Sequence, residues 1–416
     1  MMRAVALPAK RVVALVLGVA GLAGTATADP MLSAITDRNF NIDLYEGTPL
    51  GNSAAVATGG ATAANAYGSS GTLVNPSAPA VRPTTDNDRW SWDYHFDFLI
   101  GSLSTDYANT GIDYTAMGIP AADTKTRAFT FGYALRIGNY GGAITSSIRN
   151  TRIVDAVAAL PGGGTAEVYA ETIRLKTAFA RWFEDIDTSI GIAAATAIFD
   201  VKPDCSGDGC QTLFSIKGGG LEAGATVIPR MQDFRIGASY ATGIIGTEVT
   251  DDNCPDPLNC DGFVLPQDVV SPYRATIGGA YRFGPTKWNQ MIHEKWRDEE
   301  SVLALLDLVV TGPSPNAYGL DAFGINKLER SGVHTSLSVR AGAEYEWLPG
   351  RLRVRGGTYW EPGRFTGVSG RIHGTLGIEL RVFQFWLFGT RRGRITVTGD
   401  LAEGYRNLGF SIGFWH

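Results

Sequence analysis

The four cysteines of this 416-residue chain form two close pairs, Cys205 with Cys210 and Cys254 with Cys260. Two thiols at such short spacing can form a disulfide or supply two ligands to a zinc ion. Neither pair has the Cys-x-x-Cys spacing of zinc sites, and neither stretch contains a histidine. Four cysteines allow three pairings, of which we predict the two local disulfides, and we expect no bound metal.

Six aspartates crowd the same two stretches, and their carboxylates could together hold a calcium ion. They are Asp204, Asp208, Asp251, Asp252, Asp256 and Asp261. The stretches lack the alternating oxygen ligands, closed by a glutamate, that define an EF-hand loop. Solvated acidic loops are therefore the preferred interpretation, and a calcium site stays the alternative.

Histidine is the side chain used most often as a general base. The five histidines are His95, His293, His334, His373 and His416. No Gly-x-Ser-x-Gly element places a nucleophile beside any of them, and no phosphate-binding glycine motif stands between a strand and a helix. We therefore expect neither enzymatic activity nor a cofactor.

The composition is that of a folded, exported protein. Hydrophobic residues make up 44% of the chain and charged residues 19%, which excludes a disordered chain. The net charge of −5 comes without a basic run, so a nucleic-acid partner is not expected. Basic residues, an apolar stretch over residues 12–24 and the small residues Ala26-Thr27-Ala28 predict a signal peptide over residues 1–28, cleaved after Ala28.

Residues 90–100 alternate between two kinds of side chain. Every second position holds a large apolar residue: Trp90, Trp92, Tyr94, Phe96, Phe98 and Ile100. Asp93, His95 and Asp97 stand between them, on the opposite face of a strand. One face therefore favours hydrocarbon and the other favours water, which is typical of the wall of a membrane-spanning β-barrel.

The same alternation recurs to the end of the chain. It predicts an all-β fold, a transmembrane antiparallel β-barrel of about fourteen strands over residues 89–416. The strands are expected near residues 90–100, 125–137, 142–154, 167–183, 187–199, 212–228, 233–246, 272–283, 301–311, 334–348, 351–361, 371–383, 393–400 and 405–416. The polar residues assigned to the lumen are Asp93, His95, Asp97, Arg340, Glu344, Arg353 and Arg355.

Long connections fall on one side of this barrel and short ones on the other, as expected for outer-membrane barrels. One connection, over residues 284–300, is long on the side of the short turns. Trp288, Ile292 and Trp296 are spaced there at four-residue intervals. This spacing predicts a short amphipathic helix, lying at the membrane interface or packed on the barrel rim.

Residues 29–88 have a composition of their own, dominated by small residues. They contain Gly59-Gly60-Ala61 and, further on, Asn75-Pro76-Ser77, while residues 353–362 form a late strand that ends in Glu-Pro. With these elements in this order, the chain resembles the FadL-like family of outer-membrane transporters for long-chain fatty acids and toluene. PorV-like barrels are close relatives of that family, which usually has alanine where Ser77 stands.

The resemblance implies that residues 29–88 fold as a plug, or hatch, inside the barrel. Its implied binding elements are Gly59, Gly60, Ala61, Asn75 and Pro76. The implied function is hatch-gated, passive uptake of hydrophobic small molecules, such as long-chain fatty acids or aromatic hydrocarbons, across a bacterial outer membrane. A non-transporting scaffold of a secretion or surface complex, and a general porin, are the alternatives.

The expected partners follow from the same interpretation. They are the hydrophobic ligand, membrane lipid and lipopolysaccharide, and the barrel-assembly machinery during insertion. The final strand alternates Leu408, Phe410, Ile412 and Phe414, and such an aromatic-rich strand resembles the signal that this machinery reads. The chain is expected to be a monomer.

Overall fold

The computed structural model describes most of the chain. The described residues are 32–49, 52–85, 88–101, 106–111, 125–156, 166–203, 212, 214–249, 256–260, 263–294, 296–324, 326–387 and 390–414. The expected signal peptide, Cys205, Cys210, Cys254 and five of the six loop aspartates lie outside them, so these predictions stay untested. Within the described ranges, no helix is both long enough and apolar enough to cross a membrane.

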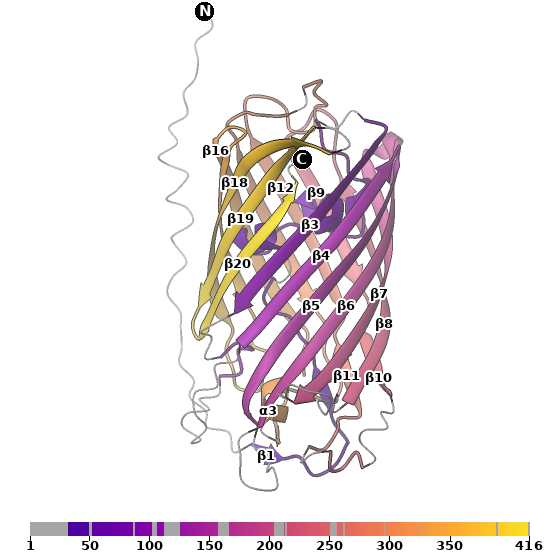
Figure 1. Ribbon diagram of the computed structural model, residues 1–416, viewed down its shortest axis with the longest axis vertical. Helices are drawn as coiled ribbons and strands as arrows, with labels where there is room; N and C mark the ends of the chain where they lie inside the picture. Colours follow the sequence, from indigo (N-terminus) through magenta and orange to yellow (C-terminus); the bar gives the residue numbers. More distant parts are fainter. Residues whose placement is uncertain are drawn as a thin grey trace, which may run out of the picture.

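Fourteen antiparallel strands close into a barrel (Figure 1). In chain order they are β3 (Trp90–Gly101), β4 (Lys125–Ile137), β5 (Tyr140–Ala156), β6 (Ala166–Phe183), β7 (Thr188–Pro203), β8 (Phe214–Val227), β9 (Phe234–Ala241) with β10 (Ile244–Val249), β11 (Asp268–Ser271) with β12 (Arg274–Phe283), β13 (Val302–Thr311), β16 (Ser336–Leu348), β17 (Leu352–Glu361), β18 (Arg371–Trp386), β19 (Thr390–Ala402) and β20 (Tyr405–Phe414). The last strand pairs with the first, from Leu408 opposite Ile100 to Gly413 opposite His95, and this pairing closes the wall. The predicted fold class is confirmed.

The two faces of each strand differ because successive side chains point to opposite sides. Strand β18 shows this regularly, with burial alternating from Arg371 to Val382. Its exposed positions are apolar: Ile372, Leu376, Ile378, Leu380 and Val382. Its buried positions include His373, Thr375, Glu379 and Arg381. An apolar exterior around a polar interior is the arrangement of a barrel that spans a membrane.

The wall is irregular where β9 gives way to β10 and β11 to β12. Glu222 pairs with Ala241 and Lys217 pairs with Thr247, but the residues between them do not pair in register. The Thr242 N–H donates to the Leu221 carbonyl over 2.9 Å and then the chain bends. Opposite this bend, Pro272 separates β11 from β12 and has no N–H to donate to the ladder.

A segment with little regular structure occupies the barrel interior. It comprises residues 52–85, called here the interior segment, with α1 (Ser53–Ala57), η3 (Ala63–Asn65), α2 (Gly68–Thr72) and η4 (Ala78–Ala80). These short elements contact strands around the wall, α1 meeting β17 to β20 and β3, and η3 meeting β8, β9 and β12. The violet ribbon inside the barrel in Figure 1 is this segment.

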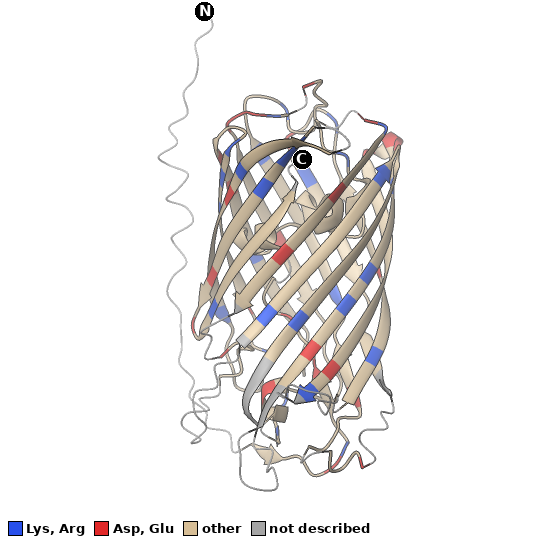
Figure 2. Cartoon of the chain, in the orientation of Figure 1, with Lys and Arg blue, Asp and Glu red and all other residues tan. Residues whose placement is uncertain are grey.

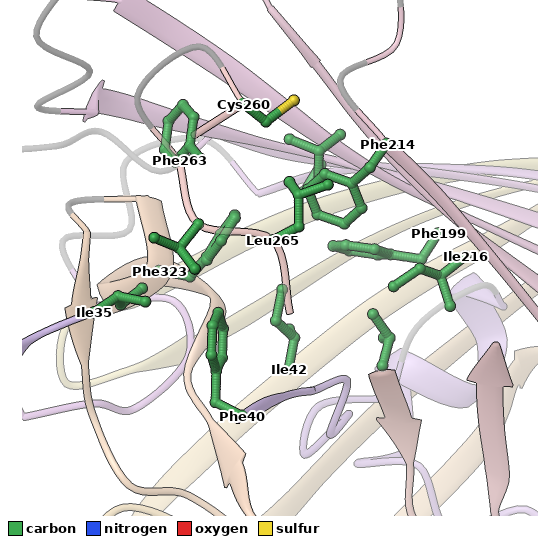
Figure 3. Close-up of a cluster of buried hydrophobic side chains, with 14 of the residues drawn as sticks. Ile35, Phe40, Ile42, Phe199, Phe214, Ile216, Cys260, Phe263, Leu265 and Phe323 are labelled. Carbon is green, nitrogen blue, oxygen red and sulfur yellow. The ribbon is translucent and has the colours of Figure 1, made fainter. Parts of the chain in front are cut away.

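The end of the barrel with the long connections, the loop end, carries a packed cap. The cap combines residues 32–44 with the described parts of 256–269 and 317–331. It contains β1 (Ser33–Ala34) paired with β15 (Lys327–Leu328), β2 (Asn41–Asp43) between β11 and β14 (Ala317–Tyr318), and α3 (Leu320–Gly324). Phe40, Phe323 and Phe263 meet Phe199 and Phe214 of the wall there (Figure 3). By the barrel rule this is the extracellular end.

The opposite end, the turn end, has short connections, including η5 (Glu184–Ile186) between β6 and β7. Its one long connection is residues 284–300, called here the strap. The predicted amphipathic helix in the strap is wrong, because its described residues form turns and bends without a helix. The physical reason is that Trp288 is buried and Trp296 half-buried, both against other residues, so no common helical stripe faces the membrane.

Candidate functional site in the barrel interior

Two aspartates of β3 hold the starts of the two α-helices of the interior segment. Asp97 Oδ1 accepts a hydrogen bond from the Ser53 N–H over 2.8 Å, at the first residue of α1. Asp93 Oδ1 accepts one from the Ser69 N–H over 2.9 Å, in the first turn of α2. The first N–H groups of a helix have no partner within the helix and carry partial positive charge. Inward carboxylates on the wall therefore stabilise both helix starts.

The same arrangement recurs on the other side of the barrel. Asp307 Oδ2 on β13 accepts from the Thr62 and Ala63 N–H groups, each over 2.8 Å, where η3 begins. At the end of α2, the Lys176 ammonium on β6 donates to the Thr72 and Leu73 carbonyls over 3.3 and 3.1 Å. Acids at helix starts and a base at a helix end both complement the helix dipole. The wall charges thus fix the segment's orientation.

His95 lies between the two aspartates of β3 and also meets the segment. Its Nδ1 lies 3.0 Å from the Ser69 hydroxyl, and the ring is 1% exposed. The ring fits because Gly132 stands opposite on β4, where an added Cβ would lie 2.2 Å from the His95 Cε1 atom. All three residues of β3 that the alternation assigned to the lumen therefore contact or flank the interior segment.

The Gly-Gly-Ala element lies where the segment passes close to β16 and β17 of the wall. Gly59 and Gly60 have φ values of +65° and +77°, which only glycine adopts readily. They end α1, with N–H groups donating to the Val56 and Ala55 carbonyls, and the Gly59 N–H also lies 3.0 Å from the Thr375 hydroxyl. A side chain on Gly59 would meet the backbone of β16 and β17 at 2.8 to 2.9 Å.

The Asn-Pro element sits on the opposite wall. Asn75 is fully buried, and its Nδ2 group donates to the Ala63 and Ala225 carbonyls over 3.3 and 3.2 Å. Its Oδ1 accepts from the Ser77 N–H and hydroxyl over 3.1 and 2.8 Å. One amide side chain therefore joins two turns of the segment to β8. Ser77 adds a hydroxyl contact of 2.8 Å to Thr226.

Inward-facing glycines of the wall provide the room for these contacts. A Cβ added at any of them would come within 2.6 Å of the interior segment. They are Gly141, Gly191, Gly224, Gly237, Gly342, Gly357 and Gly377, from seven strands around the barrel. Gly342 and Gly357 pair with each other in the sheet, and Thr58 and Gly59 lie directly over that pair. The alternation along the strands does not distinguish these glycines, since glycine occurs on either face.

A row of ion pairs lines the interior on β16, β17 and β18. Arg355 lies 2.7 Å from Glu344 and 2.8 Å from Glu379, and Arg353 lies 3.0 Å from Glu344 and 2.8 Å from Glu346. Charged residues lie along the strands as well as at the barrel ends (Figure 2). Arg340 belongs to the same wall, but it donates to the Gly47 carbonyl over 3.1 Å. Each assigned lumen residue of these strands points inward.

A second polar cluster, nearer the loop end, was missed from the sequence. His373 is fully buried, with Nδ1 2.9 Å from Asp400 and Nε2 2.9 Å from Glu361. The Tyr359 hydroxyl donates to Asp400 over 2.7 Å, and Arg371 lies 2.6 Å from Glu361. Nδ1 also lies 2.8 Å from the Tyr359 hydroxyl, and the Arg371 Nε donates to Nε2 over 3.2 Å. All five residues are engaged with one another, which indicates a structural role.

A cavity of about 160 Å³ lies between the interior segment and the wall. Its apolar lining includes Leu44, Leu73, Val74, Ala195, Ile244 and Val309. Its polar lining includes two ion pairs, Glu46 with Arg174 at 2.6 Å and Glu222 with Lys176 at 2.7 Å. The cavity also reaches Gly220, Leu221 and Thr242, where the wall pairing between β8 and β9 is interrupted.

Arg274 and Arg340 add two further cations to this lining. Among the described residues, neither forms an ion pair with a carboxylate. The cavity is therefore mixed in character, with an apolar surface and an excess of positive charge.

Comparisons with known proteins bear on the fold. No protein-family model matches the sequence, and no curated protein matches it. The toluene transporter TodX of Pseudomonas putida superimposes with a TM-score of 0.51 over 91% of this chain and 99% of that one, at 12% identity. The CymD monoaromatic hydrocarbon channel gives a TM-score of 0.50 over 87% and 96%, also at 12% identity.

The chain shares the fold of these barrels. A TodX variant, described as the deltaS2S3 mutant monoaromatic hydrocarbon channel, gives the same result, with a TM-score of 0.51 at 11% identity. At this identity the comparison establishes the architecture, and the interior contacts must be argued from this chain's own residues.

Cys260 is the one cysteine inside the described ranges. It is buried in the cap beside Phe263, it is not a free thiol, and its backbone pairs with that of Phe263. Its expected partner Cys254 lies outside those ranges. The local pairing therefore stays a prediction, as does the interpretation of the acidic stretches.

Proposed function

We propose that this protein is an outer-membrane channel for passive uptake of hydrophobic small molecules, with the interior segment as its gate. The observation that carries the proposal is the cavity between that segment and the wall. Its lining combines apolar side chains with charged ones, and it reaches the interrupted pairing of β8 and β9. A ligand site next to a movable segment and a weak point of the wall suits a channel.

The size of the cavity favours one class of cargo. A dry cavity of about 150 Å³ accommodates one benzene molecule. The present cavity of about 160 Å³ therefore fits a single-ring aromatic compound without rearrangement. A long-chain fatty acid fits only after the interior segment moves. We infer that small aromatic compounds are the preferred cargo and that fatty acids are the weaker candidates.

The interior segment argues against a general porin, whose lumen is an open aqueous channel. Its helices are tied to the wall by Asp93, Asp97 and Asp307, and its turns rest on wall glycines. These ties are hydrogen bonds and close contacts without a covalent link. Gating would require their exchange for water or ligand contacts.

The test introduces a large side chain into the cavity from strand β7. Ala195 is buried and lines the cavity, whereas its neighbour Ala194 is exposed on the outer face of the same strand. We expect Ala195→Trp to abolish saturable uptake of labelled toluene by cells that lack their own transporter. Ala194→Trp is the matched control and should leave uptake unchanged.

Two results would contradict the proposal. Equal toluene uptake by the two variants would show that the cavity is not on the route. Absence of uptake by the correctly inserted wild-type chain, with both toluene and oleate, would favour the scaffold alternative. Heat-modifiable migration on gels checks that each variant has formed a barrel.

A further inference from the structure

A second cavity, of about 120 Å³, lies at the turn end, on the other side of the interior segment. Three parts of the chain enclose it. They are the end of the interior segment over residues 81–85, the strap through Trp288, Trp296 and Arg297, and the wall through Arg235, Arg282 and Leu303. The sites discussed above do not include it.

The strap is fixed across this end by contacts to both sides. Trp288 is 8% exposed and packs against Ala61 and Ala64 of the interior segment and Leu303 of β13. The Ile292 N–H donates to the Thr84 carbonyl over 2.9 Å. These contacts hold the Trp288 ring against the interior segment, where the ring forms one side of the cavity.

The far end of the strap is anchored by charge. Asp298 lies 2.6 Å from Arg392 and 3.3 Å from Arg381, on β19 and β18. The Arg392 guanidinium also lies 4.4 Å from the centre of the Trp296 ring. The strap therefore reaches from β12 to β18 and β19 and keeps both tryptophans at the cavity.

The charges around the cavity do not balance. Arg282 and Arg297 both pair with the single carboxylate of Glu299. Arg297 also donates to the carbonyls of Lys287, Trp288 and Gln290, which occupies its terminal nitrogens. Arg353 is neutralised by Glu344 and Glu346, which line the cavity with it. Together these two sets balance, three arginines against three glutamates, so the excess positive charge of the lining comes from Arg235 and Arg82.

Arg235 is a buried cation of this lining that no carboxylate of the described residues neutralises. It is 5% exposed, its Nε donates to Asn289 Oδ1 over 2.9 Å, and its guanidinium lies 3.9 Å from the centre of the Trp288 ring. Its two terminal nitrogens donate no hydrogen bond to any described residue. The guanidinium is stacked on one face and held at Nε, so the positions of its two terminal nitrogens are fixed. Two such nitrogens match the two oxygens of a carboxylate.

We propose that this cavity is a binding site for a carboxylate-bearing small molecule, held by the terminal nitrogens of Arg235, with its apolar part against Trp288 and Trp296. The carboxylate would neutralise the charge of Arg235 and satisfy its free donors. The cavity holds an acid of about one ring, or the acidic end of a longer chain. This site goes beyond the proposed uptake function, and neither depends on the other.

The test measures binding to the purified full chain in a detergent without carboxylates. Benzoate, decanoate and inorganic phosphate are the probes, and tryptophan fluorescence is the readout. We expect saturable binding of benzoate or decanoate, with no displacement by phosphate. Arg235→Gln should weaken it about 10- to 100-fold, as expected for loss of charge-assisted hydrogen bonds. Arg235→Lys should retain part of the affinity, and Lys287→Gln, at an exposed lysine of the strap, should retain all of it.

Unchanged carboxylate affinity in Arg235→Gln would overturn the proposal, and so would phosphate binding in preference to carboxylates. Should Arg235→Gln fail to form a barrel, the wild-type chain decides the matter. A crystal soaked with 4-bromobenzoate should show the anomalous signal of bromine beside Trp288, and a signal confined to other places would contradict the site. Uptake measurements are unaffected by either result, so the two proposals fail independently.

Discussion

Asn75 occupies the space that a side chain on Gly224 would need. A Cβ built on that glycine would lie 2.2 Å from Asn75 Oδ1. The buried amide joins two turns of the interior segment and bonds to the carbonyl next to this glycine, that of Ala225. The interior segment can therefore stay in place only because Gly224 has no side chain.

Substitution Gly224→Val should displace the interior segment and leave the barrel intact. Its β-branched side chain suits a strand but overlaps the Asn75 amide. We expect larger single-channel conductance in planar bilayers and faster entry of small polar antibiotics. Gly219→Val is the matched control, since a Cβ there meets nothing closer than 3.6 Å. Equal conductance of the two variants would count against a segment that seals the lumen.

The carboxylate of Asp307 should help to hold the interior segment in the lumen. Its carboxylate accepts two backbone N–H groups, and each such bond contributes about 2 kcal/mol, or roughly thirtyfold in the closed-to-open ratio. We expect basal conductance to rise in the order wild type, Asp307→Asn, Asp307→Leu. Leu306→Ala, on the lipid-facing side of the same strand, should behave as wild type. A reversed order would contradict the view that Asp307 holds the interior segment in place.

The cap should loosen as the pH rises. Burial, and then the neighbouring Asp106, raises the pKa of Asp321 to about 7. Burial, and then Asp321 and Asp106, raises the pKa of Glu329 to about 9. A carboxyl whose pKa is raised in the folded state does not lower the stability of the cap while it is protonated. The loss of folding free energy begins above the ordinary carboxyl pKa near 4, and it grows until pH 7 for Asp321 and pH 9 for Glu329.

Hydrogen exchange at residues 317–331, corrected for the intrinsic rate at each pH, measures this effect. We expect protection to fall between pH 5 and pH 9, by up to about tenfold per pH unit for each titrating group. Glu329→Gln should remove the part of the loss above pH 7. A cap whose protection rises with pH would contradict these ionisation states.

Peptide mapping without reduction should find Cys254 linked to Cys260 and Cys205 linked to Cys210. The cap buries Cys260 among Phe263 and other apolar side chains, so it is shielded from exchange with the second pair. Reduction should loosen the loop end while the strands stay protected, because the wall is closed by its own ladder. A link between the two pairs would contradict the local pairing.

Several interior residues could be found from the sequence because each continued a visible alternation. Asp93, His95 and Asp97 stand between six large apolar residues, and Arg353 and Arg355 stand beside Val354. Asp307 carried a comparable signal, as the one charged residue in the apolar strand over residues 302–311. Glu379 and Asp400 could have been found in the same way. The wall glycines had no such signal, because glycine is compatible with either face.

The sequence by itself determined the barrel. A period of two, repeated over fourteen strands, is a local property: each strand must turn its apolar side to hydrocarbon whatever its neighbours do. Only the tertiary structure decided which wall residues meet the interior segment, because residues that touch there lie as far apart in the chain as Thr58 and Gly342. It also decided the strap, where Trp288 turns inward to the Arg235 guanidinium and Trp296 turns to that of Arg392. Spacing along the chain predicts a helix from such tryptophans, and only the partners that surround them in space determine otherwise.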